Sequence, residues 1–315
     1  MTRSWWIWAR ILGGCATLTV VLWRIGTGPF LDGVRTVDVR ALTTAAAVAV
    51  PTTVCCAWRW SLVSRGLGVD MPLRTAVLSC YRSQFLNTTL PGGVLGDVHR
   101  GLRHGRDAGD AGRGLRTVAW ERFAGQVVQV GMATVVLLAL SSPVHASMPY
   151  VVAASVVALA PVALLARRLP RVGWTLGVRT ARTAVRDLRD GLLGRRAWPA
   201  IVVVSALAVV GHIVTFLVAA RTAGVTASPV RMLPLALLVL LAMGIPTNVA
   251  GWGPREGVAA WAFGAAGLGA SQGVATSVVY GVMVLVAGLP GAGVLAVGWL
   301  RRDHARARLQ RVQHA

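Results

Sequence analysis

The sequence predicts an all-α integral membrane protein with about six full transmembrane helices and two broken or re-entrant helix pairs in an inverted-repeat arrangement. Of its 315 residues, 55% are hydrophobic, and the mean hydropathy is +0.63. Several apolar runs approach the roughly 20 residues that a helix needs to cross a bilayer. Two runs end in Pro and Gly, which interrupt helices, and charged residues follow. A composition this apolar excludes a soluble globular domain.

The net charge of +21 does not indicate nucleic-acid binding. Arginines gather in short segments between the apolar runs, and this bias is typical of the cytoplasmic loops of membrane proteins. We therefore expect a multi-pass protein of the bacterial inner (plasma) membrane with both termini in the cytoplasm. The four cysteines lie within apolar runs and lack metal-ligand spacing, so no metal or other cofactor is expected.

The apolar runs that are expected to be full spans are 1–25, 41–60, 117–140, 150–166, 199–220 and 273–300. Arg59 and Arg65 at the end of the second run place that end in the cytoplasm. We expect the basic, glycine-rich segment 97–116 to be a cytoplasmic loop and the segment 26–40 to be a loop of mixed charge. Residues 141–149 contain no arginine or acid and are expected outside.

A single membrane domain, 1–315, is expected, with approximate halves 41–166 and 199–300. A basic cytoplasmic loop, 167–198, joins the halves, and a basic cytoplasmic tail, 301–315, ends the chain. Helical spacing places several loop arginines on one face, which is either solvated or lies on anionic lipid headgroups. These arginines are Arg179, Arg182, Arg186 and Arg189.

The first broken element is the segment 86–100. An apolar half-helix over 73–90 ends at Pro91, and the charged residues Asp97 and Arg100 follow within ten positions. A helix interrupted at membrane depth is tolerated only where protein or a water-filled cavity satisfies the freed backbone groups. This segment therefore indicates a site rather than a simple span.

The second broken element, 246–256, repeats the spacing of the first. Pro246 is followed by Gly251 and Arg255 at the same offsets, and Glu256 again places an acid close to the arginine. Paired interruptions in two halves of a chain point to the binding site of a transporter with inverted repeats. Each element is either a re-entrant hairpin or a pair of short spans.

Four charged residues are the candidate substrate-binding set. We expect Arg100 and Arg255 to bind an anionic headgroup, since guanidinium forms two parallel hydrogen bonds to phosphate. Asp97 and Glu256 would orient those arginines or bind a cationic group. The helix N-termini that follow the two prolines would add backbone N–H donors. The alternative is that these residues form structural ion pairs that lock the broken helices.

A supporting role is expected for the other residues of the motifs. A structural role is favoured for Glu121 and Arg122, which are adjacent in one helix. Asn87 and Asn248 are placed to satisfy interrupted backbone. The supporting set is Pro91, Gly92, Gly93, Gly96, Glu121, Arg122, Pro246, Asn248, Gly251 and Gly253. The sequence contains no recognisable nucleotide loop, metal cluster or catalytic triad, so we do not expect an enzyme.

Together these motifs resemble the transmembrane-domain family of lysylphosphatidylglycerol synthases, a flippase-like family. The matching pieces are Pro91-Gly92-Gly93, Gly96-Asp97, Arg100, Glu121-Arg122, Pro246, Gly251, Gly253, Arg255-Glu256-Gly257 and Leu289-Pro290-Gly291. The resemblance runs from the second span onward. It implies movement of lipids, notably aminoacylated phosphatidylglycerol, between leaflets. Because the chain ends soon after its last span, we expect a stand-alone member without the soluble aminoacyl-transferase domain.

Two functions follow as hypotheses. The first is a flippase-like transporter that moves an anionic or aminoacylated phospholipid, or a polyprenyl-phosphate-linked substrate. Its partners would be membrane lipids with anionic headgroups. The alternative is a non-transporting scaffold for a lipid-modifying enzyme or a glycosyltransferase, with the segment 167–196 as its docking or lipid surface. An integral-membrane glycosyl or acyl transferase is the least favoured hypothesis, because no pair of residues in the sequence has the context expected of a catalytic acid and base.

Overall fold

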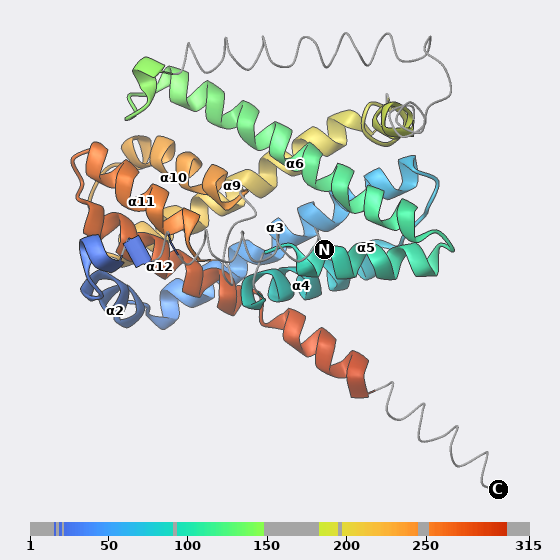
Figure 1. The fold of residues 1–315 in the computed structure, drawn as a ribbon, viewed down its shortest axis with the longest axis horizontal. Helices are drawn as coiled ribbons and strands as arrows, with labels where there is room; N and C mark the ends of the chain where they lie inside the picture. The colour runs from blue at the N-terminus through green and yellow to red at the C-terminus, as the bar shows by residue number, and fades with distance from the viewer. Residues whose placement is uncertain are drawn as a thin grey trace, which may run out of the picture.

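The computed structural model describes residues 22–90, 93–147, 183–194, 197–244 and 252–300, together with residues 16, 19 and 20. Throughout these ranges the regular structure is helical, and no β-strand occurs in them (Figure 1). The predicted all-α class is confirmed. The expected span 150–166 and most of the expected span 1–25 lie outside the described residues.

Four helices are long and apolar enough to cross a membrane. They are α3 (Val39–Gly66), α6 (Ala111–Ala139), α9 (Trp198–Thr222) and a helix over Ala270–Leu300 that begins with α12 (Ala270–Ala287). Each covers one of the predicted spans 41–60, 117–140, 199–220 and 273–300. A short 3-10 turn, η1 (His145–Ser147), follows α6. The chain is thus a multi-pass membrane protein.

Two pairs of shorter helices accompany the long ones. The first pair is α4 (Leu73–Thr89) and α5 (Leu95–Asp107), and the second is α10 (Pro229–Met243) and α11 (Pro254–Ala265). The longest of them, α4, has 17 residues, fewer than the roughly 20 that span a bilayer. Figure 1 shows the pairs at opposite ends of the molecule, with α4–α5 on the right and α10–α11 on the left.

Two segments that the sequence predicted to be loops are largely helical. Segment 97–116 belongs to α5 and α6, joined by a turn at residues 108–110. Segment 26–40 contains α2 (Gly28–Arg35), whose Gly33 lies against Val278 of α12. Arginine is a good helix former, so a high arginine density does not exclude a helix. The glycines that suggested a loop instead allow close helix packing.

The α5–α6 contact depends on Gly114. A Cβ atom built there would lie 2.3 Å from the carbonyl oxygen of Gly101 and 2.3 Å from the backbone nitrogen of Gly105. The turn before α6 is fixed by Asp110, whose side chain accepts a hydrogen bond from the Arg113 N–H at 2.9 Å. That bond lowers the pKa of the Asp110 carboxyl.

We expect Gly114→Ala to lower the free energy of unfolding by about 1–3 kcal/mol, because the added methyl group must push α5 and α6 apart. Gly131→Ala on the same helix is the matched control, since no atom lies within 4 Å of a Cβ built there. The control should unfold at the same SDS concentration as the wild type or at a slightly higher one, because alanine favours helix. Both can be measured by SDS titration in mixed micelles. Equal stability of the two variants would contradict the close contact.

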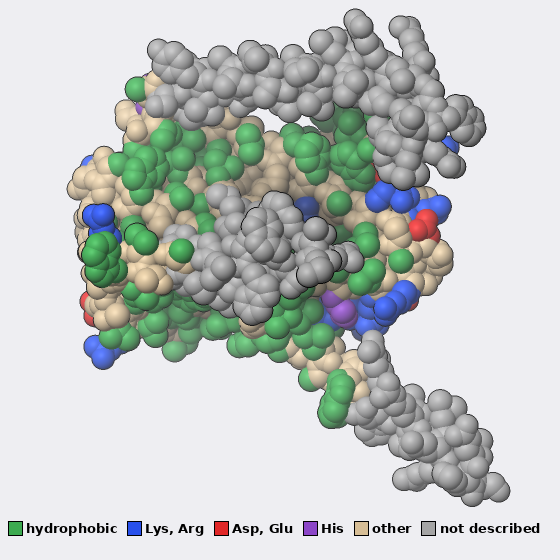
Figure 2. Space-filling view, viewed as in Figure 1, with side chains coloured by type: hydrophobic (Ala, Val, Ile, Leu, Met, Phe, Trp, Pro, Cys, Tyr) green, Lys and Arg blue, Asp and Glu red, His purple; other side chains and the backbone are tan. Residues whose placement is uncertain are grey.

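The outer faces of the long helices are apolar, and the charges lie toward the ends. Val127 and Val135 of α6 and Val203 and Leu207 of α9 are all exposed. In Figure 2 hydrophobic side chains are spread above and below the centre of the view, while most of the visible arginines and acids lie at its left and right edges. This distribution suits a molecule with a lipid-facing belt between two polar ends.

The helix over Ala270–Leu300 connects the two short pairs. Near its start, Gly273 lies against Ala259 of α11, where a Cβ would be 2.3 Å from the Ala259 carbonyl oxygen. Near its end, Gly291 lies against Tyr81 of α4, where the corresponding distance is 2.2 Å. α12 therefore packs closely against α11, and the helical stretch after the turn at residues 288–289 packs closely against α4.

Part of the basic segment that joins the halves is packed against the bundle. Its π-helix η3 (Leu188–Leu192) meets the end of α3, where a Cβ at Gly66 would lie 2.6 Å from the carbonyl oxygen of Asp190. Leu192 is buried, and Arg116 of α6 pairs with Asp187 at 2.9 Å. Arg179 and Arg182 of the predicted arginine face lie outside the described residues.

Candidate functional site

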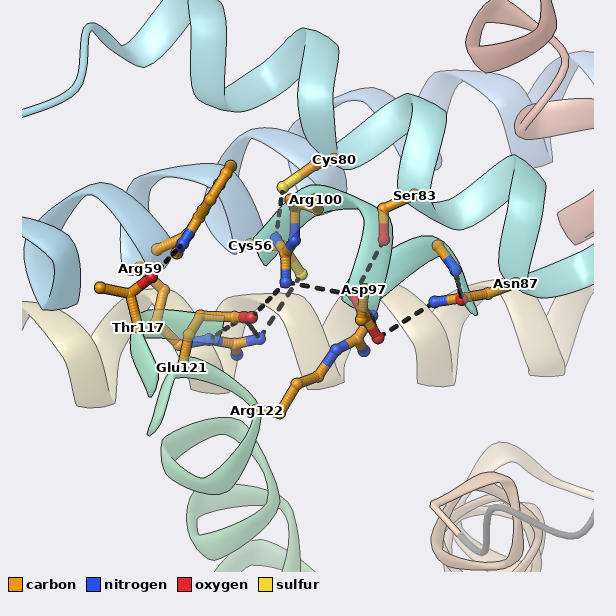
Figure 3. Close-up of polar contacts among 12 residues, drawn as sticks. Cys56, Arg59, Cys80, Ser83, Asn87, Asp97, Arg100, Thr117, Glu121 and Arg122 are labelled. Carbon is orange, nitrogen blue, oxygen red and sulfur yellow. Dashed lines mark hydrogen bonds and ion pairs between the residues drawn. The ribbon is translucent and has the colours of Figure 1, made fainter. Parts of the chain in front are cut away.

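Five charged side chains from α3, α5 and α6 form one connected group (Figure 3). We call it the charged cluster, and its members are Arg59, Asp97, Arg100, Glu121 and Arg122. It joins three guanidinium groups to two carboxylates and therefore carries an excess of one positive charge. Buried charges persist in proteins when they are paired and hydrogen-bonded, and every member of this network makes an ion pair with another member.

Glu121 is the centre of the charged cluster. Arg59 Nε donates to Glu121 Oε1 at 2.8 Å, and Arg100 Nη2 donates to Glu121 Oε2 at 2.8 Å. A second nitrogen of Arg59, Nη2, also donates to Oε1. The Glu121 carboxylate thus joins α3 to α5 through a side chain of α6, and it is fully buried.

Asp97 connects the cluster to the interrupted helix pair. Its carboxylate lies 3.2 Å from Arg100 Nη2 and 2.8 Å from Arg122 Nη2. Ser83 Oγ donates to Oδ1 at 2.8 Å, and Asn87 Nδ2 donates to Oδ2 at 3.1 Å. Both partners belong to α4, so Asp97 holds α5 against α4 while it contacts the arginines (Figure 3).

The interruption itself depends on Asn87 and Gly96. Asn87 Oδ1 accepts a hydrogen bond from the Gly96 N–H at 2.8 Å, which confirms the predicted role of Asn87 in satisfying interrupted backbone. A Cβ at Gly96 would lie 2.1 Å from the carbonyl oxygen of Ser83, so only glycine fits. Gly93 has a φ of +61°, a conformation that glycine adopts easily.

Arg100 is enclosed. Its side chain is 3% exposed, and Nη1 donates to Cys80 Sγ at 3.1 Å. The guanidinium carbon lies 4.4 Å from the ring centre of Trp60, a cation–π contact. Trp60 Nε1 in turn donates to Thr117 Oγ1 at 3.5 Å. Arg100 is therefore held by protein groups on several sides.

Arg122 is the open member of the cluster. Its side chain is 50% exposed, whereas that of Asp97 is 12% exposed. The hydrogen bond and ion pair that it makes within the described part of the chain both run from Nη2 to Asp97. The sequence favoured a structural role for Arg122, yet of the three arginines of the cluster its side chain is the most exposed.

A second, smaller group lies on α11 and α12. Arg255 Nε donates to Glu256 Oε1 at 2.8 Å and to Ser277 Oγ at 3.0 Å. Glu256 Oε2 accepts the Gly253 N–H at 2.7 Å, where Gly253 has a φ of +124°. The carboxylate of Glu256 therefore occupies the N-terminus of α11. The sequence had predicted that backbone N–H groups at this position would bind a ligand.

The surroundings of Arg255 are closed. Arg255 is 5% exposed and Glu256 is fully buried. The guanidinium lies 5.6 Å from the ring of Tyr280, whose hydroxyl is 3.1 Å from His212 Nδ1. A Cβ at Gly281 would lie 2.4 Å from Arg255 Nη2, so the arginine packs directly on α12.

The predicted site residues thus fall into two groups. Asp97 and Arg100 meet the predicted supporting residues Glu121 and Arg122 in the charged cluster. Arg255 and Glu256 pair with each other at the second interruption. The predicted supporting residues Pro91, Gly92, Pro246, Asn248 and Gly251 lie outside the described residues.

Sequence reasoning missed Arg59. It was interpreted only as a marker of the cytoplasmic end of the second span, but α3 continues to Gly66 and buries it. The available signal was its apolar context, Cys55-Cys56-Ala57-Trp58-Arg59-Trp60, because a charge within such a run needs a partner.

A model described as the lysylphosphatidylglycerol synthase TM region matches residues 7–291. The matched part includes both short helix pairs, the charged cluster and the Arg255–Glu256 pair. No curated protein and no solved structure matches the chain.

Proposed function

Because the chain belongs to the lysylphosphatidylglycerol synthase TM region family, we propose that it is a flippase-like lipid transporter. Its substrate would be an anionic or aminoacylated phospholipid, or a polyprenyl-phosphate-linked lipid, which it moves between leaflets. The observation that carries the proposal is the charged cluster, with its excess positive charge and its half-exposed Arg122. A guanidinium that is already oriented by a carboxylate suits the phosphate that these lipids share.

In this proposal Arg122 makes the first contact with the headgroup phosphate. Asp97 holds Arg122 at 2.8 Å and would release it in part as the phosphate replaces a carboxylate oxygen. Arg100 and Arg59 remain behind Glu121 and supply positive potential without leaving their partners. Such a site attracts an anion yet binds it weakly enough to let it leave, because part of the positive charge is already compensated.

The two short pairs support a transport path. We propose that α4–α5 and α10–α11 are re-entrant hairpins that enter from opposite sides of the membrane, as an inverted repeat would require. Their position at opposite ends of the bundle supports this (Figure 1). The α5–α6 end would face the cytoplasm, since it carries Arg106, Arg113 and Arg116.

Leaflet exchange in proteoliposomes tests the proposal. Labelled phosphatidylglycerol, its aminoacylated form and a polyprenyl-phosphate lipid would each be assayed with wild type and Arg122→Gln. We expect wild type to exchange one of them and Arg122→Gln to slow that exchange by about tenfold, as the loss of a charge-assisted hydrogen bond predicts. Arg113→Gln is the matched control on α6, because Arg113 pairs with Asp110 at the helix start.

Normal exchange in folded Arg122→Gln would contradict the proposed role of the charged cluster. If folded wild-type protein exchanged no lipid, the scaffold would become the better hypothesis, and co-purification of a lipid-modifying enzyme would be its test. The packing of η3 against α3 argues against a freely projecting docking arm over the described residues 183–194.

A further inference from the structure

A groove opens between the start of α3 and the end of α9, away from the charged cluster. Its volume is about 500 Å³. The side chains that give the groove its chemical character are Asp38, Arg40, Val214, Leu217, Val218 and Arg221. The 1.5 Å rise per residue places Arg40 roughly 28 Å from Arg59 along α3, close to the thickness of about 30 Å of a hydrocarbon core.

The lining of the groove is amphipathic. Val214, Leu217 and Val218 form an apolar wall on α9, while Arg40 and Arg221 are exposed arginines of α3 and α9. Arg221 Nη1 donates to the Val225 carbonyl oxygen at 3.0 Å, which fixes the side chain at the end of α9. A ligand for this groove therefore needs an anionic part and an apolar part side by side.

The acid in the lining does not cancel both arginines. Asp38 Oδ1 accepts the Ala41 N–H at 2.7 Å and so caps the N-terminus of α3, where a carboxylate is favoured by the helix dipole. The groove keeps a net positive charge. Charge complementarity thus favours an anion, and the valine and leucine wall favours one that carries an acyl chain.

We propose that this groove binds one phospholipid with an anionic headgroup, in the leaflet opposite to the one nearest the charged cluster. Its phosphate would contact Arg40 and Arg221, and one acyl chain would lie along Val214, Leu217 and Val218. A water-soluble anion such as inorganic phosphate would leave the apolar wall bare. Binding at this groove does not require that the protein transport lipid, so the two proposals stand or fall separately.

The test is lipid binding to the purified full chain in detergent. Protein stripped of lipid would be titrated with dioctanoyl phosphatidylglycerol, dioctanoyl phosphatidylcholine and inorganic phosphate, in an Arg122→Gln background that suppresses binding at the charged cluster. We expect phosphatidylglycerol to bind most tightly, and Arg40→Gln with Arg221→Gln to weaken it by about tenfold or more. Arg35→Gln, an exposed arginine on nearby α2 that does not line the groove, should bind like the background.

Further variants test separately how the headgroup and the acyl chain contribute to binding. Leu217→Asn should weaken binding of the phospholipid without creating affinity for inorganic phosphate, because it adds a polar group to the apolar wall. Unchanged phosphatidylglycerol affinity in the folded double arginine variant would overturn the proposal. An equal loss of phosphatidylglycerol affinity in Arg35→Gln would also overturn it, because it would indicate a diffuse charge effect. Equally tight binding of inorganic phosphate would overturn it too, because it would indicate a simple anion site.

Discussion

Replacing Glu121 with glutamine is expected to lower the free energy of unfolding by about 3–5 kcal/mol, because it leaves Arg59 and Arg100 buried without their shared carboxylate. Both arginines donate to Glu121 at 2.8 Å, and both are almost wholly enclosed. The glutamine amide keeps the shape of the side chain and loses the charge. SDS titration in mixed micelles would measure the change.

Asp70→Asn is the control for this prediction. Asp70 also pairs with an arginine, Arg65 at 3.0 Å, but both side chains are mostly exposed. Exposed ion pairs contribute about 0–1 kcal/mol, so this variant should unfold nearly as the wild type does. Similar stabilities of Glu121→Gln and Asp70→Asn would mean that the charged cluster is hydrated in solution and not closed as described.

The contrast between these acids explains what the sequence could and could not predict. The four long helices, the two pairs of shorter helices and the need of Asp97, Arg100 and Glu121 for partners follow from hydropathy and from the high free-energy cost of placing a charge in lipid. The pairing among them does not follow. Glu121 lies in α6, Asp97 in α5 and Arg59 in α3, and their meeting depends on how those helices pack.

Close helix packing was the other feature hidden from sequence reasoning. Glycine-rich, arginine-rich sequence at 97–116 predicted a loop, because glycine weakens helices and arginine marks cytoplasmic segments. In the fold, Gly101, Gly105 and Gly114 instead bring two helix backbones together. Whether a glycine ends a helix or packs one depends on its neighbour in space, which a single sequence does not reveal.

A second large change in stability is expected at the Arg255–Glu256 pair. Glu256→Gln alone is expected to lower the free energy of unfolding by about 3–5 kcal/mol, because it leaves the Arg255 guanidinium uncompensated in a closed site. Adding Arg255→Met removes the stranded charge, so the double variant should recover part of that loss, with a coupling of about 1–3 kcal/mol. Strictly additive effects in SDS titration would contradict a buried ion pair.

Leaflet exchange by the same double variant decides between the two roles that sequence reasoning left open for Arg255. The burial of Arg255, its bonds to Glu256 and Ser277 and its contact with α12 favour a lock that holds α11 in place. We therefore expect the folded double variant to keep most of its exchange, while Arg122→Gln loses it. The opposite pattern, a stable double variant without exchange, would make Arg255 the headgroup ligand.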